Sequence, residues 1–144
     1  MGENGCITKL HHIGFVVNDI NRSQAFYEAL GFSFHDRWSE TPEECALGMG
    51  VEGAALELLQ MVGYGVMLEF IQYRQSAGSQ ERPAANLRGI GHTAFEVDDI
   101  YAVVRRLEER GMAFVSPVIE HDFAPWIQLT DPDGIRVEFM ELRK

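Results

Sequence analysis

The chain contains an internal repeat, which restricts its fold more than any other feature of the sequence. Residues 12–34 align without a gap with residues 92–114. Eight of these 23 positions hold the same residue in both copies: 12, 15, 17, 19, 20, 28, 31 and 34 in the first. Ordinary residue usage would supply about one or two matches by chance. The two halves are therefore expected to share one fold.

A second alignment extends the repeat along the chain. Residues 65–70 (GVMLEF) align with 134–139 (GIRVEF) at a spacing of 69 instead of 80, so the first copy carries eleven additional residues. Residues 75–87 are rich in Ser, Gly, Pro and polar residues, which is typical of a linker. We therefore expect a tail over 1–8, a first module over 9–74, this linker, and a second module over 88–144. A module of this size is marginal as an independent domain, so the two should stabilise each other.

Strand signals occur at equivalent places in the two modules. β-Branched and aromatic runs at 10–17 and 90–97 predict the first strand of each module. Three more strands are expected in each, over about 32–38, 51–61, 65–73 and about 112–118, 125–130, 134–142. The sequence DPDG at 131–134 predicts a type I turn between the last two.

One helix is expected between the first and second strands of each module. Asp19 and Asp99 stand where N-caps belong, and Gly31 and Gly111 should end the helices because glycine adopts the left-handed conformation at low cost. The resulting order is βαβββ, twice. The sequence therefore predicts an α+β protein built from two βαβββ modules.

Composition and charge restrict the partners. The chain has 144 residues, of which 46% are hydrophobic, enough for a real core. Its net charge of −10 would repel nucleic acid. No apolar run approaches the roughly 20 residues of a membrane span, and the first residues do not resemble a signal peptide. We expect a cytoplasmic protein that binds neither nucleic acid nor membranes.

Four repeated ionisable residues form a candidate metal site. Strand alternation places His12, Glu69, His92 and Glu138 on the sheet face away from the helices, whereas His11 has the opposite parity. Two neutral imidazoles and two carboxylates form an N₂O₂ set that balances a divalent cation. The sequence therefore predicts one divalent ion, with Ni, Co, Mn, Zn and Fe(II) all acceptable.

These residues lie in segments that resemble the vicinal oxygen chelate superfamily, which includes glyoxalase I, methylmalonyl-CoA epimerase, extradiol dioxygenases, fosfomycin-resistance enzymes and bleomycin-binding proteins. The segments are HIGFVVNDINRSQAFYEALGF at 12–32, GHTAFEVDDI at 91–100 and DPDGIRVEF at 131–139. The resemblance implies a cupped mixed β-sheet around one metal, with the helices outside, often in a homodimer. It places His12, Glu69, His92 and Glu138 at the ligand positions, in the pattern of glyoxalase I and the epimerases.

Such an ion would chelate two vicinal oxygens of a small-molecule substrate and stabilise the charge left by proton abstraction next to a carbonyl. This favours an isomerase, an epimerase or a glyoxalase-type lyase. By resemblance, a ligand carboxylate serves as the base, which nominates Glu138 first and Glu69 second. The candidate substrate contacts are Arg136, which could instead pair with a nearby acid, together with His121, Phe123 and Trp126.

Two other functions stay open on the sequence alone. An Fe(II) extradiol-type dioxygenase needs two histidines and one carboxylate, which leaves Glu69 as a surplus ligand and gives His121 a role as a non-ligand acid. A metal-free drug-binding protein, as in the bleomycin-resistance branch, needs an apolar groove and leaves the four matched ligands without a role.

Overall fold

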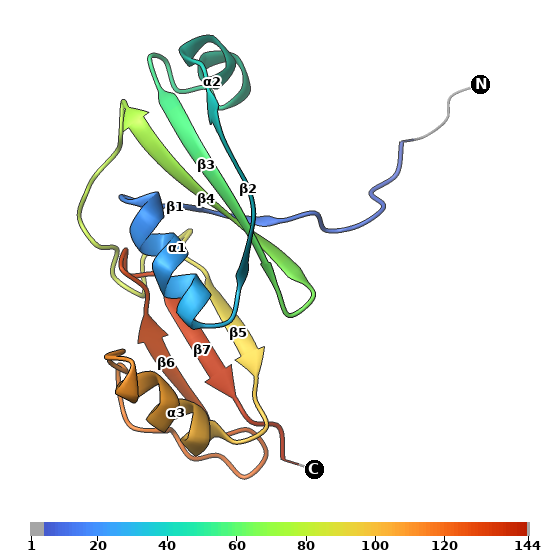
Figure 1. The fold of residues 1–144 in the computed structure, drawn as a ribbon, viewed down its shortest axis with the longest axis vertical. Helices are drawn as coiled ribbons and strands as arrows, with labels where there is room; N and C mark the ends of the chain where they lie inside the picture. Colours follow the sequence, from blue (N-terminus) through green and yellow to red (C-terminus); the bar gives the residue numbers. More distant parts are fainter. Residues whose placement is uncertain (1–4, 144) are drawn as a thin grey trace. The chain divides into compact units, whose positions relative to one another are not determined.

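The computed structural model describes residues 5–143 and divides them into two units, the first ending at Gln80 and the second beginning at Glu81. Each unit contains a mixed β-sheet and at least one helix (Figure 1), so the predicted α+β class is confirmed. Residues 1–4, which fall in the expected tail, and residue 144 lie outside the described residues. None of the helices within residues 5–143 has the length and apolar character needed to cross a membrane.

The first unit holds a four-stranded sheet with strand order β1-β4-β3-β2. Its elements are β1 (Ile13–Val16), α1 (Ile20–Ala29), β2 (Ser33–Glu40), α2 (Pro42–Gly48), β3 (Ala55–Gly63) and β4 (Val66–Gln75). β1 runs parallel to β4, and the other neighbours are antiparallel. The order of the strands and of α1 along the chain matches the predicted βαβββ.

The second unit holds a three-stranded sheet with strand order β5-β7-β6. Its elements are β5 (His92–Glu96), α3 (Ile100–Glu109), β6 (Trp126–Thr130) and β7 (Arg136–Met140). The strand expected over 112–118 was wrong: this stretch makes only isolated bridges, from Phe114 to Leu129 and nearby from Ile119 to Trp126. Pro117 lies between the bridges and has no backbone N–H to donate, so a continuous ladder cannot form there.

The predicted helix ends are confirmed in both units. Asp19 Oδ1 accepts a hydrogen bond from the Asn21 amide at 2.9 Å, and Asp99 Oδ1 accepts one from the Ala102 amide at 2.8 Å. After the helices, Gly31 and Gly111 have φ of 103° and 81°. The duplicated Asp and Gly positions therefore set where α1 and α3 begin and end.

Helix α2 was not predicted, although its N-terminus carries a recognisable signal. Thr41 and Glu44 form a capping box, and Pro42 follows the cap. This helix lies among the additional residues of the first copy. Its buried Cys45 belongs to an apolar cluster with Leu56 and Leu58 of β3, against which Ile71 of β4 also packs.

Aromatic residues mark the sheet face that meets α1. Phe15 of β1 and Phe70 of β4 stack with ring centroids 6.2 Å apart, and Tyr27 of α1 lies 4.6 Å from Phe70. Phe70 is paired in register with Phe15, whereas the preceding Glu69 is paired with Gly14. Because side chains alternate along a strand, Glu69 faces away from α1, as predicted.

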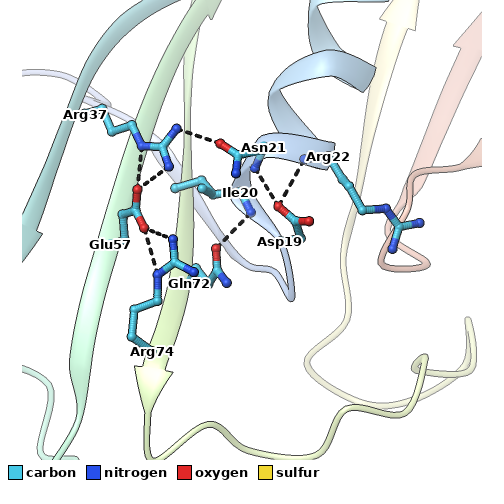
Figure 2. Close-up of polar contacts among 8 residues, drawn as sticks. All are labelled: Asp19, Ile20, Asn21, Arg22, Arg37, Glu57, Gln72 and Arg74. Carbon is cyan, nitrogen blue, oxygen red and sulfur yellow. Dashed lines mark hydrogen bonds and ion pairs between the residues drawn. The ribbon is translucent and has the colours of Figure 1, made fainter.

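A charged network ties α1 to the sheet of the first unit (Figure 2). Glu57 of β3 accepts hydrogen bonds on Oε1 from Arg37 of β2 and on Oε2 from Arg74 of β4, with Nε–oxygen distances of 2.6 and 2.8 Å. Arg37 Nη1 also donates to Asn21 Oδ1 in α1 at 2.8 Å. The two guanidinium groups, Arg74 above all, hold the pKa of the Glu57 carboxyl below its ordinary value of 4.5.

The Glu57→Gln variant is expected to have a free energy of unfolding about 1–2 kcal/mol lower, because the negative charge between the two arginines is lost and one of the two accepting oxygens becomes an amide NH₂ that cannot accept. A carboxyl whose pKa is lowered by folding stabilises the protein above its unfolded pKa and loses this effect as the pH falls through the folded pKa. The difference between variant and unmodified protein should therefore shrink below pH 4.5. Urea unfolding at several pH values measures it, with exposed Glu52→Gln as the control; a difference that does not change with pH would contradict the assignment.

Gly31→Ala is expected to destabilise the chain by about 1–3 kcal/mol, because alanine is strained at positive φ. A Cβ at Gly31 would also collide with the hydroxyl of Tyr64, which donates a hydrogen bond to the Leu30 carbonyl at 2.5 Å. The matched control is Gly111→Ala, at the same helix position but with open space around it. Thermal unfolding should show the larger loss for Gly31→Ala, and equal losses would refute the role of Tyr64.

Candidate metal centre

The first unit brings His12 and Glu69 together. Glu69 lies in β4 with only 7% of its surface exposed, beside Gly14 of the neighbouring β1. His12 comes directly before β1, and its Nε2 lies 3.4 Å from Glu69 Oε1. The side chain of His12 is 35% exposed. A half-exposed imidazole therefore faces a buried carboxylate.

The second unit repeats this pair with His92 and Glu138. Glu138 lies in β7 opposite Ala94 of β5, and His92 is the first residue of β5. His92 Nε2 lies 3.8 Å from Glu138 Oε2. Both side chains are more exposed than their counterparts, at 51% for His92 and 16% for Glu138. The second pair is thus the more open of the two.

Each glutamate is held by a glutamine that the sequence analysis missed. Gln60 of β3 is paired in register with Glu69, and its Nε2 donates to Glu69 Oε2 at 2.7 Å. Gln128 of β6 is paired with Glu138, and its Nε2 donates to Glu138 Oε2, also at 2.7 Å. The signal was available, since pairing each hairpin back from its turn sets the glutamine opposite the glutamate.

His11 also contacts the first pair, contrary to the prediction from strand parity. Its Nδ1 lies 2.9 Å from Nδ1 of His12. Strand alternation does not apply here, because β1 begins only at Ile13. The side chain of a residue next to His12 can therefore turn toward it.

The donor atoms suit a divalent cation. Nitrogen and oxygen atoms that bind the same first-row ion lie about 3.0–3.4 Å apart, a range that includes the 3.4 Å of the first pair, whereas the second pair at 3.8 Å would have to close slightly. Glu69 is buried, and the glutamine that holds it supplies a hydrogen bond but no charge, so a cation would offset the cost of burying the carboxylate. Within residues 5–143, the structure assembles no group of three or more His, Cys, Asp or Glu side chains able to hold an ion. That both pairs share one ion stays a prediction.

The candidate substrate residues all lie in the second unit. Arg136 of β7 is two residues from Glu138, on the same strand face, and is paired in register with His92. Trp126 begins β6 and pairs with Met140 on that face. His121 and Phe123 lie in the segment before β6 and are exposed, Phe123 at 78%. Arg136 makes no ion pair with any residue that the structure describes.

A comparison with protein-family models identifies the family of the chain. Residues 9–139 match the model of the "Glyoxalase/Bleomycin resistance protein/Dioxygenase superfamily". The chain belongs to this superfamily. The family resemblance predicted from the repeated segments is confirmed.

Within the superfamily, the chain is similar both to a much longer protein and to one of nearly its own length. It is 26% identical to lactoylglutathione lyase of Schizosaccharomyces pombe, with 92% of this chain aligned but only 47% of that protein, so it spans about half of the lyase. It is 27% identical to the uncharacterized protein YaeR of Escherichia coli, with 94% and 97% of the two chains aligned.

A solved structure supports the superfamily fold independently of these relatives. The glyoxalase family protein APC24694 from Bacillus cereus superimposes with a TM-score of 0.83. The superposition covers 100% of this chain and 99% of that one at 19% identity. This likeness establishes a shared fold.

Proposed function

We propose that the chain is a divalent-metal-dependent enzyme of the glyoxalase or epimerase type, acting on a small oxygenated substrate by proton abstraction next to a carbonyl. The duplicated His–Glu pair, with each glutamate held by a glutamine, is the observation that carries this proposal. A divalent metal is a typical cofactor in the superfamily. The similarity to a lactoylglutathione lyase favours a lyase or isomerase reaction.

The proposed ligands are His12, Glu69, His92 and Glu138, contributed either by one chain or by two copies in a homodimer. When bound, the metal supplies a Lewis acid that stabilises negative charge on the substrate oxygens. Two imidazoles and two carboxylates would hold the ion through four protein ligands, and a small substrate with two vicinal oxygens could then bind beside them. The remaining chemistry falls to side chains of this chain.

Glu138 is the proposed base. Its carboxylate is more exposed than that of Glu69, and both the Gln128 amide and the imidazole nitrogen of His92 lie nearest to the same oxygen, Oε2. The other oxygen, Oε1, is therefore the proposed site that accepts the substrate proton and returns it. Glu69 is buried and is the second candidate for this role.

Arg136 is the proposed contact for an anionic group of the substrate, because its planar guanidinium binds carboxylate or phosphate with two hydrogen bonds. Trp126, Phe123 and His121 are proposed to contact the rest of the substrate. The net charge of −10 repels anions from the protein as a whole, so a local arginine would favour the binding of an anionic substrate.

Solvent exchange tests the proposed reaction. The metal-loaded protein is incubated in deuterated water with small 2-oxo and 2-hydroxy acids and with the hemithioacetal of methylglyoxal and glutathione. We expect deuterium next to the carbonyl of recovered substrate or product for at least one compound, and none with Glu138→Gln. Absence of both exchange and product across the panel would contradict the proposal, and oxygen uptake with catechols would replace it by ring-cleaving dioxygenation.

A further inference from the structure

The two ring nitrogens of His12 face different partners. Its Nε2 lies 3.4 Å from Glu69 Oε1, whereas its Nδ1 lies 2.9 Å from Nδ1 of His11. The two rings meet edge to face, with centroids 5.2 Å apart and planes at 84°. One nitrogen of the His12 ring thus faces the carboxylate and the other faces His11.

The chemistry of imidazole makes this neighbour useful to a metal ligand. A neutral histidine carries one N–H, so a His12 that binds an ion through Nε2 must keep its proton on Nδ1 and needs an acceptor there. Nδ1 of a neutral imidazole accepts or donates according to its tautomer. When the Nε2 of His12 carries a proton, the Nδ1 of His11 can donate to the Nδ1 of His12. When that Nε2 binds an ion, the Nδ1 of His11 can accept from the Nδ1 of His12 instead. A carbonyl or carboxylate at the same place could only accept.

The second half of the chain has no histidine equivalent to His11. The residue equivalent to His11 is Gly91, which has no side chain to offer His92. A Cβ at Gly91 would meet no atom within 4 Å, so nearby atoms do not exclude a side chain at this position. The His11 contact is therefore not part of the duplicated ligand set.

We propose that His11 is a positioning residue, which orients the His12 ring and holds the Nδ1 proton so that Nε2 is presented to a divalent cation. The inference rests on the proposed function, since it assumes that His12 is a metal ligand. It predicts that His11 prearranges the first of the two pairs only.

Calorimetric titration of the metal-free protein with Zn(II) tests the role. We expect His11→Ala to weaken Zn(II) binding by about 10–100-fold, the usual effect of losing a residue that orients a metal-bound histidine. His11→Asn should recover most of the affinity, because its amide can accept or donate near the position of the lost Nδ1. The control His35→Ala, in exposed β2, should bind like the unmodified protein. Unchanged affinity in His11→Ala, or an Asn variant as weak as the Ala variant, would overturn the proposal.

Nitrogen NMR of the imidazole rings separates this inference from the proposed function. Spectra of the metal-free protein are recorded at about pH 8, where free histidine is neutral. His11→Ala should shift both ring nitrogens of His12 and leave those of His92 unchanged. With Zn(II), the proton of His12 should be found on Nδ1. Failure of the unmodified protein to bind Zn(II), Ni(II), Co(II), Mn(II) and Fe(II) would refute the metal-dependent function, whereas unchanged His12 resonances in metal-free His11→Ala would refute the role of His11.

Discussion

Replacing His12 or His92 by alanine is expected to lower the affinity of the protein for a divalent cation more than about 100-fold. Each residue supplies one of the two proposed nitrogen ligands, and loss of a residue that merely orients such a ligand already costs 10–100-fold. The repeat predicts losses of similar size for the two variants, because it makes the residues equivalent. Equilibrium dialysis of metal-free protein against Zn(II) or Mn(II) measures both.

The control for these variants is His35→Ala, since His35 lies exposed in β2 and belongs to neither pair. Its affinity should match that of the unmodified protein. A loss in His12→Ala alone would mean that the first pair binds an ion without the second. That result would contradict the four-ligand site and leave two separate His–Glu pairs.

Glu138→Gln is expected to lower turnover by about 10²–10⁴-fold, the usual contribution of a positioned general base. The amide keeps an oxygen atom that can bind the ion, and it keeps the shape of the side chain, but it cannot accept the substrate proton. Glu69→Gln should reduce turnover less, because Glu69 is the more buried of the two carboxylates and is proposed chiefly as a ligand. Rates at saturating substrate and metal occupancy, measured on the same samples, separate loss of the base from loss of the ion.

Glu96→Gln serves as the control for this comparison. Glu96 is the last residue of β5, is exposed, and lies four residues after His92. Its turnover should equal that of the unmodified protein. An inactive Glu69→Gln beside an active Glu138→Gln would assign the base to Glu69 and contradict the proposed role of Glu138.

Much of the fold could be predicted because its signals are local and occur twice. The N-caps Asp19 and Asp99 and the glycines that end the helices lie at equivalent positions, so each copy supports the interpretation of the other. Strand alternation also placed Glu69 and Glu138 correctly, on the faces opposite Phe70 and Phe139 of the same strands. Both features depend on neighbours within a few residues, which a sequence displays directly.

The errors arose where local patterns compete or where strands end. The apolar run over 112–118 was typical of a strand, but Pro117 interrupts its hydrogen bonds. Helix α2 was missed because the additional residues of the first copy have no counterpart in the second to compare them with. His11 was assigned to the wrong side because strand parity was applied to a residue that precedes the strand.

The sequence by itself determined the repeat, the α+β class, the boundaries of α1 and α3 and the two His–Glu pairs, because each follows from residue spacing along one element or from the comparison of two copies. Only the tertiary structure decided how neighbouring side chains contact those pairs. The Gln60 and Gln128 amides reach the glutamates of neighbouring strands at 2.7 Å, and the His11 ring turns to lie 2.9 Å from the adjacent His12 ring; both arrangements depend on side-chain orientation in the folded chain. Hydrogen bonds require alignment within a few tenths of an ångström, and the spacing of residues along a chain does not specify distances that finely.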